Sequence, residues 1–120
     1  MNIIKIARIT REQQVNPAFS GPVSYQRIIG ADMSNSFRIT QVNFNEGVTN
    51  KFHSHTGEQV LFITEGKGIV ATDKEQIEVS TGDIIFFPAG EKHRHGAAKN
   101  ATFSHIVVMS SDSKTTLFGG

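Results

Sequence analysis

The chain has 120 residues, which is the size of one domain with a single hydrophobic core. Lys and Arg together number 12 and Asp and Glu 11, so the formal charge of +1 indicates neither a nucleic acid nor an anionic membrane as a partner. Cysteine is absent, which excludes disulfide bonds, thiolate metal sites and a cysteine nucleophile.

The N-terminal residues lack the pattern of a secretion signal. Lys5 and Arg8 interrupt the apolar run of residues 1–10, so no signal-peptide core is present. The longest apolar stretch, residues 84–88, is far shorter than the roughly 20 residues that a membrane-spanning helix needs. We therefore predict a cytoplasmic protein without a membrane partner.

Eleven glycines and three prolines divide the chain into short segments rich in Ile, Val, Phe and Thr. This pattern is typical of an all-β barrel or sandwich, and no window shows the 3.6-residue period of a helix. Two weaker strands are predicted first, at residues 3–9 and 23–29. The stronger predicted strands follow at residues 37–45, 49–55, 59–65, 69–72, 75–79, 84–87 and 102–109.

Glycine, proline and small polar residues mark the turns between these strands. Turns are predicted at residues 46–47, 66–68, 73–74, 80–83 and 88–90. The strand at 84–87 is entirely apolar and is predicted to be buried. The predicted aromatic core residues are Phe62, Phe86, Phe87 and Phe103. Residues 110–120 are polar and end in glycine, so we predict a frayed or loosely docked tail there.

Four of the five histidines lie in two His-x-His pairs. His53 and His55 fall on a predicted strand, where alternation points both imidazoles to the same face, so they can converge on one ion. His93 and His95 repeat the arrangement after the turn at 88–90. A single His-x-His pair on a strand is more often exposed or hydrogen-bonded than part of a metal site.

The glycines and proline around both pairs follow a regular spacing. The first motif reads G-x5-H-x-H-x3-Q-x6-G over residues 47–66. The second reads G-x5-P-x-G-x2-H over residues 82–93. Each glycine marks a turn that needs positive φ or close packing, and the proline ends a strand that cannot continue its ladder.

These two motifs resemble those of the cupin superfamily, and in particular a single-domain metal-binding cupin with the type-2 barrel. The resemblance implies an all-β fold, a jelly-roll antiparallel β-barrel or double-stranded β-helix, in one domain over residues 1–120. The cupin barrel would span about 37–109, with the polar tail at 110–120. The resemblance also implies one divalent metal ion inside the barrel, with these ligands: His53, His55, Gln59 and His93.

Two positions depart from the family pattern. Gln59 stands where Glu is the usual ligand, and Ala97 stands where the second motif commonly has Asn. Glu58, the neighbour of Gln59, is predicted to face the opposite side of the strand. Three neutral imidazoles and an amide oxygen leave a divalent ion its full charge, which makes it a stronger Lewis acid than a Glu-bound ion. Manganese or iron is favoured, and nickel, zinc or copper also suits such ligands.

Further segments look like one cupin subgroup, which includes the bacterial manganese cupins with hydroxynitrile lyase activity and the carboxymuconolactone-decarboxylase-like cupins. They read HSHTGEQ at 53–59, HRHGAA at 93–98, FSH at 103–105 and FSG at 19–21. The subgroup usually has Trp where this chain has Arg94. By this resemblance His95 is the candidate general acid/base, since an unperturbed imidazole titrates near pH 6.5, in the range for proton transfer at neutral pH; the alternative is a hydrogen-bonded barrel residue.

The predicted strand at 37–45 supplies more of the candidate pocket. Arg38, Thr40, Val42 and Phe44 share one face of it by alternation, and the resemblance places Thr40 and Val42 in the cavity wall. Arg38 either clamps an anion or lies at an exposed rim. His105 is expected to contact the substrate or to orient His95, with a core histidine as the alternative.

Three functions remain open at this point. The first is a metalloenzyme with lyase (hydroxynitrile-lyase-like), isomerase or dioxygenase chemistry on a small oxygen-bearing substrate, in which His95 moves a proton. The second is a non-catalytic small-molecule or metal-binding cupin, and the third is a barrel with an empty site. A homodimer is predicted because a small barrel leaves sheet edges exposed, and residues 3–9 alternate and can add to a partner's sheet.

Overall fold

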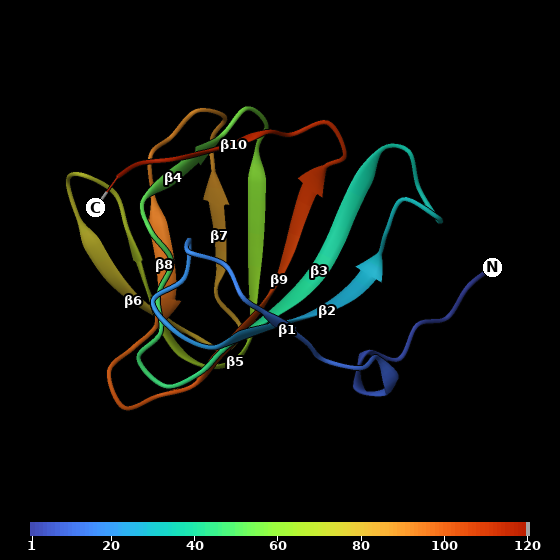
Figure 1. Cartoon of the computed structure of the whole chain (residues 1–120), viewed down its shortest axis with the longest axis horizontal. Helices are drawn as coiled ribbons and strands as arrows, with labels where there is room; N and C mark the ends of the chain where they lie inside the picture. Colours follow the sequence, from blue (N-terminus) through green and yellow to red (C-terminus); the bar gives the residue numbers. More distant parts are fainter. Residues whose placement is uncertain (120) are drawn as a thin grey trace.

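The computed structural model describes residues 1–119, and it is almost entirely antiparallel β-structure (Figure 1). Its strands are β1 (Glu12–Gln14), β2 (Val23–Ile29), β3 (Phe37–Phe44), β4 (His53–His55), β5 (Gln59–Ala71), β6 (Gln76–Ser80), β7 (Ile84–Phe87), β8 (Arg94–Ala97), β9 (Phe103–Ser110) and β10 (Thr115–Leu117). A short 3-10 turn, η1 (Ile6–Arg8), precedes them. The predicted all-β class is confirmed. Within residues 1–119, no helix has the length and apolar character needed to cross a membrane.

The long strand β5 joins the two sides of a curled sheet. Its first half pairs with β9 and β7, and its second half pairs with β6 and β8. Beyond β9 the sheet continues through β3 and β2 to β1 at the edge. In Figure 1, β2, β3 and β9 lie on one side of β5 and β7, and β4, β6 and β8 lie on the other. The short strand β4 pairs with β10 and is bridged to the chain before β8 through His53 and His93.

The turn predicted at residues 66–68 is wrong, because β5 runs through it without a break. Instead, the pairing of β5 with β9 shifts register between Ile63 and Glu65. Gly66 has a φ of +80°, and a Cβ at this position would collide with the carbonyl oxygen of Thr102. The glycine therefore lets β5 bend and approach the neighbouring chain closely, rather than reverse its direction. The turns predicted at 46–47, 73–74 and 80–83 are confirmed.

The strand predicted at residues 3–9 is also wrong. These residues contain η1, and Gln26 of β2 donates hydrogen bonds from its amide nitrogen to the carbonyl oxygens of Ile6 and Ile9, both at 3.0 Å. A side chain thus satisfies carbonyl groups that a neighbouring strand would otherwise bind. The first strand is β1, which pairs with β2.

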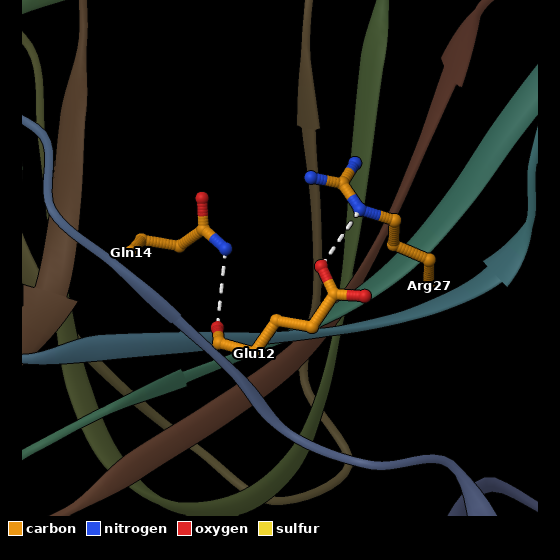
Figure 2. A network of polar contacts seen from close by, with 3 residues as sticks. All are labelled: Glu12, Gln14 and Arg27. Atoms are coloured by element: carbon orange, nitrogen blue, oxygen red, sulfur yellow. Dashed lines mark hydrogen bonds and ion pairs between the residues drawn. The ribbon is translucent and has the colours of Figure 1, made fainter.

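An exposed polar contact accompanies the pairing of β1 with β2. The Arg27 Nε lies 3.3 Å from the Glu12 Oε2, and the Gln14 side chain donates to the backbone oxygen of Glu12 at 3.1 Å (Figure 2). Both charged side chains are more than half exposed, so this ion pair contributes little stability. The edge strand is held mainly by its backbone hydrogen bonds to β2.

Three further segments differ from the prediction. The strand predicted at 49–55 is reduced to β4, and β8 was not predicted at all. The tail predicted to fray contains β10, which pairs in register with β4, Thr115 opposite His55 and Leu117 opposite His53. The C-terminal segment is therefore built into the wall of the barrel beside the first histidine pair.

The aromatic core is smaller than predicted. Phe87 and Phe103 are buried, but Phe62 is 41% exposed and Phe86 is 55% exposed. The strand β7 is not buried as predicted, since Ile84 is also exposed. Alternate residues of β5 and β7 face away from the barrel interior, and the outer face of this part of the sheet has no cover in the described residues.

Candidate metal centre

Three buried histidines converge inside the barrel. Alternation along β4 brings His53 and His55 to its inner face, and the bridge between His53 and His93 brings the third imidazole beside them. One ring nitrogen from each residue lies within 4.8 Å of the other two. The His93 ring stacks on Phe87 with a centroid distance of 3.8 Å, so the apolar core fixes the orientation of this imidazole.

Backbone carbonyl groups set the tautomer of two of these rings. The His53 Nδ1 lies 2.7 Å from the carbonyl oxygen of Lys51, and the His93 Nδ1 lies 2.8 Å from that of Glu91. Because a carbonyl oxygen only accepts, each Nδ1–H donates to it. In the neutral rings each Nε2 then carries a lone pair that is available to a cation.

His55 is held by the C-terminal segment. Its Nδ1 lies 2.9 Å from the Thr115 hydroxyl oxygen on β10. Its Nε2 is buried and has no hydrogen-bond partner among residues 1–119. A buried polar atom without a partner is costly, and a metal ion bound to this nitrogen would remove that cost.

Gln59, at the start of β5, completes the donor set. Its side-chain oxygen lies 3.0 Å from the His93 Nε2, and its amide nitrogen donates weakly to the Met109 sulfur at 3.5 Å. With its proton on Nδ1, the His93 ring offers this oxygen a lone pair and no hydrogen. Two acceptors facing each other are stabilised by a cation between them. Three imidazole nitrogens and an amide oxygen therefore fit a divalent transition metal.

Burial keeps these histidines neutral. Burial, with a smaller contribution from the charge of His53, lowers the pKa of His55 to about 4. Burial also lowers the pKa of His93 to about 4, against the opposing effect of its hydrogen bond to Glu91, and it lowers the pKa of His53. Metal binding requires neutral imidazoles, so at neutral pH these ligands need not lose a proton.

Two more buried histidines lie beyond the three. His95 lies on β8, two residues after His93, and its ring centroid lies 5.0 Å from that of His105 on β9. The Asn50 side-chain oxygen accepts from the His95 backbone N–H at 2.9 Å, and its amide nitrogen lies 3.4 Å from the His95 ring. Both ring nitrogens of His105 are buried without a partner in the described chain.

The predicted proton-transfer role of His95 changes with its environment. Burial lowers the pKa of His95 well below its ordinary value, and the neighbouring His105 lowers it further. Burial alone lowers the pKa of His105 to about 3. Both rings are therefore neutral at neutral pH. The neutral His95 ring carries one free lone pair, and the burial that keeps it neutral also makes it a weaker base than a free imidazole.

A cavity of about 480 Å³ connects these groups. The predicted substrate-contacting residues Thr40, Val42 and His105 line it, together with His53, His55, Gln59 and His95. His93 is 1% exposed and lies behind this surface. The remaining wall is largely aromatic and aliphatic and includes Phe19, Tyr25, Phe44 and Val107. None of the lining residues is Lys, Arg, Asp or Glu.

The two arginines considered in the sequence lie outside this cavity wall. Arg38 donates to the backbone oxygens of Ser34 and Phe37 at 2.7 and 2.9 Å, so it does not clamp an anion in the cavity. Arg94 faces away from His93 and His95, and its guanidinium lies 5.1 Å from the Phe52 ring centroid. Glu58 is exposed, as predicted.

Sequence reasoning missed several residues of the cavity wall. Thr115 and Leu117 line it from the C-terminal segment, and Asn50 lines it next to His95. Their positions depend on pairings between distant parts of the chain, and no local pattern indicates them. Alternation along β10 would place Thr115 and Leu117 on one face, but three residues of strand in a polar segment give no usable signal.

Comparison with known proteins agrees with this architecture. The family model described as Cupin domain matches residues 40–109. An (R)-mandelonitrile lyase from Granulicella tundricola is 30% identical over 92 residues, which cover 76% of this chain and 70% of that protein. A gentisate 1,2-dioxygenase from a Ralstonia species is 38% identical over 58 residues, which cover 48% of this chain but only 16% of that enzyme.

A solved structure extends the likeness to nearly the whole barrel. The crystal structure of a cupin-like protein from Thermotoga maritima superposes with a TM-score of 0.86 at 24% identity, covering 94% of this chain and 89% of that one. At this identity the likeness establishes the fold alone. Together with the family match, it shows that the chain belongs to the cupin superfamily and has relatives among lyases.

Proposed function

We propose that this protein is a metal-dependent enzyme that acts on a small, uncharged, oxygen-bearing substrate, with carbon–carbon lyase chemistry as the first reaction to test. The observation that carries the proposal is the convergence of three buried imidazoles at a substrate-sized cavity. Two of them, His53 and His55, lie in the cavity wall, and the His55 Nε2 has no partner among the described residues. His53, His55, His93 and the Gln59 oxygen would hold a divalent ion. Manganese or iron is our preferred metal.

The relatives support the class of reaction. The similar protein from Granulicella tundricola is an (R)-mandelonitrile lyase, and a gentisate 1,2-dioxygenase is similar to 58 residues of this chain. Lyase chemistry is tested first because the mandelonitrile lyase matches 76% of this chain and the dioxygenase only 48%. Dioxygenation is the second reaction to test, followed by isomerisation.

The chemistry of the cavity favours an uncharged substrate with an apolar body. A bound divalent ion would polarise a substrate oxygen and lower its pKa. His95 would accept the proton of that hydroxyl group, with Asn50 holding the imidazole in place. His105 would offer one of its free ring nitrogens to a second polar atom, and Thr40 and Val42 would contact the body of the substrate. The cavity wall has no charged side chain that could bind a phosphate or a dicarboxylate.

The first test is metal content by elemental mass spectrometry, on the wild type and on His53→Ala. We expect about one equivalent of a divalent transition metal, lost in the variant. Glu58→Gln is the matched control, since Glu58 lies next to Gln59 but is exposed. A wild-type protein without metal after reconstitution would contradict the proposal.

The second test separates catalysis from binding. Turnover is measured on mandelonitrile and aliphatic cyanohydrins, and oxygen uptake is measured with uncharged dihydroxybenzenes. We expect His95→Ala to retain its metal while turnover falls by about 10²–10⁴-fold. Full turnover in His95→Ala would refute its role. A metal-loaded protein that binds these molecules without converting them would support the non-catalytic cupin instead.

A further inference from the structure

Gln59 differs from a carboxylate ligand because the two ends of its side chain are chemically different. A carboxylate offers a cation two equivalent oxygen atoms, whereas an amide offers one oxygen and an NH2 group that only donates hydrogen bonds. Rotation of the amide by half a turn would replace the oxygen facing the metal site with two N–H groups. A metal site that uses Gln59 therefore needs a neighbour that keeps the oxygen turned inward.

His93 by itself favours the wrong orientation of this amide. Because its Nδ1–H donates to the carbonyl oxygen of Glu91, the His93 ring presents a lone pair at Nε2. That nitrogen lies 3.0 Å from the Gln59 oxygen, which also only accepts. In the metal-free protein, a rotated amide could instead donate an N–H to His93. The rotated form would turn the Gln59 oxygen away and also occupy the His93 Nε2, so it would remove two of the proposed donor atoms.

Met109 is the neighbour that opposes this rotation. It lies directly opposite Gln59 in the pairing of β9 with β5, two strands that run side by side in Figure 1, and both residues line the cavity. The Met109 sulfur lies 3.5 Å from the Gln59 amide nitrogen. A thioether sulfur accepts hydrogen bonds weakly and has no hydrogen to donate. It therefore favours the NH2 group of Gln59 as its neighbour over the oxygen.

The surroundings give this weak contact its effect. Within residues 1–119, the Met109 sulfur is the one hydrogen-bond acceptor of the Gln59 side-chain nitrogen. Gln59 is 5% exposed, so little of it reaches solvent that could replace a lost partner. A buried donor without a partner is costly. Loss of the sulfur would therefore leave the amide free to rotate toward the lone pair of His93.

We propose that Met109 is a positioning residue, which holds the Gln59 amide with its oxygen toward the metal ion and its nitrogen toward the sulfur. This role rests on the metal site of the proposed function. It follows from the ligand type, because Gln59 needs a neighbour that accepts a hydrogen bond and donates none. In a Gln59→Glu variant the two ligand oxygens are equivalent, so Met109 has nothing to orient.

The test is a double-mutant cycle on metal affinity, measured as competition for Mn²⁺ between metal-free protein and a chromophoric chelator. Met109→Leu nearly conserves the side-chain volume and removes the acceptor. In the wild-type background we expect it to weaken Mn²⁺ binding by about three- to tenfold, the range for one neutral hydrogen bond. In the Gln59→Glu background we expect the same substitution to leave the affinity unchanged or to raise it, because the sulfur there faces a carboxylate oxygen.

The matched control is Met33→Leu, which makes the same exchange at a residue that is 42% exposed and outside the cavity wall. It should bind Mn²⁺ like the wild type. Far-UV circular dichroism checks that all variants are folded.

Two results would overturn the role of Met109 and leave the metal site standing. One is an equal loss of affinity from Met109→Leu in both backgrounds, because general packing or direct ligation by the sulfur acts whichever residue stands at position 59. The other is wild-type affinity in Met109→Leu. A wild type that binds none of Mn²⁺, Fe²⁺ and Zn²⁺ would instead overturn the proposed function, and the role of Met109 with it.

Discussion

Thr115 is the residue whose replacement tests the geometry of the metal centre most directly. Its hydroxyl oxygen lies 2.9 Å from the His55 Nδ1 and is the partner that leaves the His55 Nε2 free to face the other two imidazoles. Valine has nearly the same shape and also favours a strand. The variant Thr115→Val therefore removes this hydrogen bond and leaves the pairing of β10 with β4 in place.

The expected loss is in metal affinity. Removing an outer partner of a metal-bound histidine typically weakens metal binding by about 10–100-fold, which corresponds to about 1.4–2.7 kcal/mol. We place Thr115→Val inside this range, since the hydroxyl is the one partner of the His55 Nδ1 among the hydrogen bonds of the described chain. Thr115→Ser keeps the hydroxyl and should restore most of the affinity.

The assay is a competition titration of metal-free protein against a chromophoric chelator, which reports affinity independently of any activity. Thr116→Val is the matched control, because Thr116 is the next residue on β10 and lies opposite Ser54 rather than a histidine. It should bind metal like the wild type. If Thr115→Val also binds metal within twofold of the wild type, the hydroxyl does not position His55 and the reasoning fails.

Three other changes test separate parts of the structure. Gln59→Glu adds a negative charge to a neutral ligand set and should tighten metal binding by about tenfold or more, as measured in the same titration; equal affinity would place residue 59 outside the ligand set. Metal-free protein should lose stability as the pH falls below the unfolded-state histidine pKa of about 6.5, because the folded-state pKa values of His55 and His93 are about 4 and that of His105 about 3. Each histidine contributes a slope of about 1.4 kcal/mol per pH unit between its two pKa values, so in urea denaturation the slope of the variant His105→Leu should be shallower by that amount below about pH 6.5 and unchanged above it. Gly66→Ala should lower the free energy of unfolding by more than about 2 kcal/mol, because the residue has φ +80° and its Cβ would meet the Thr102 carbonyl group; a smaller loss would mean that β5 relaxes there at little cost.

The parts of the fold that follow from local pattern could be predicted from the sequence. Alternation in a short strand places His53 and His55 on one face, and the structure has both on the inner face of β4. The turns at Gly47 and Gly82 follow from the need for positive φ, which both residues have. Each of these features depends on residues a few positions apart in the chain.

Features that depend on distant pairings could not be predicted in this way. Gly66 looks like a turn residue in isolation, yet the nearby Thr102 backbone explains it as a close approach within one strand. The exposure of Phe62 and Phe86 likewise depends on how distant parts of the chain pack. The strand β7 is as apolar as a core strand, and which of its faces is covered depends on the rest of the fold.

The environment of the histidines changes the chemistry that their side chains suggest in isolation. A free imidazole can donate or accept a proton near neutral pH, whereas burial keeps His95 and His105 neutral in this barrel. A cavity lined by neutral rings, amides, hydroxyl groups and apolar side chains has no charge of its own to balance. Any charge that develops on a bound substrate would then have to be stabilised by the divalent ion that we propose, and the neutral Gln59 would leave that ion its full charge. Gln in place of the usual Glu and the uncharged cavity wall would therefore act in the same direction, because both would leave the stabilisation of substrate charge to the proposed metal ion.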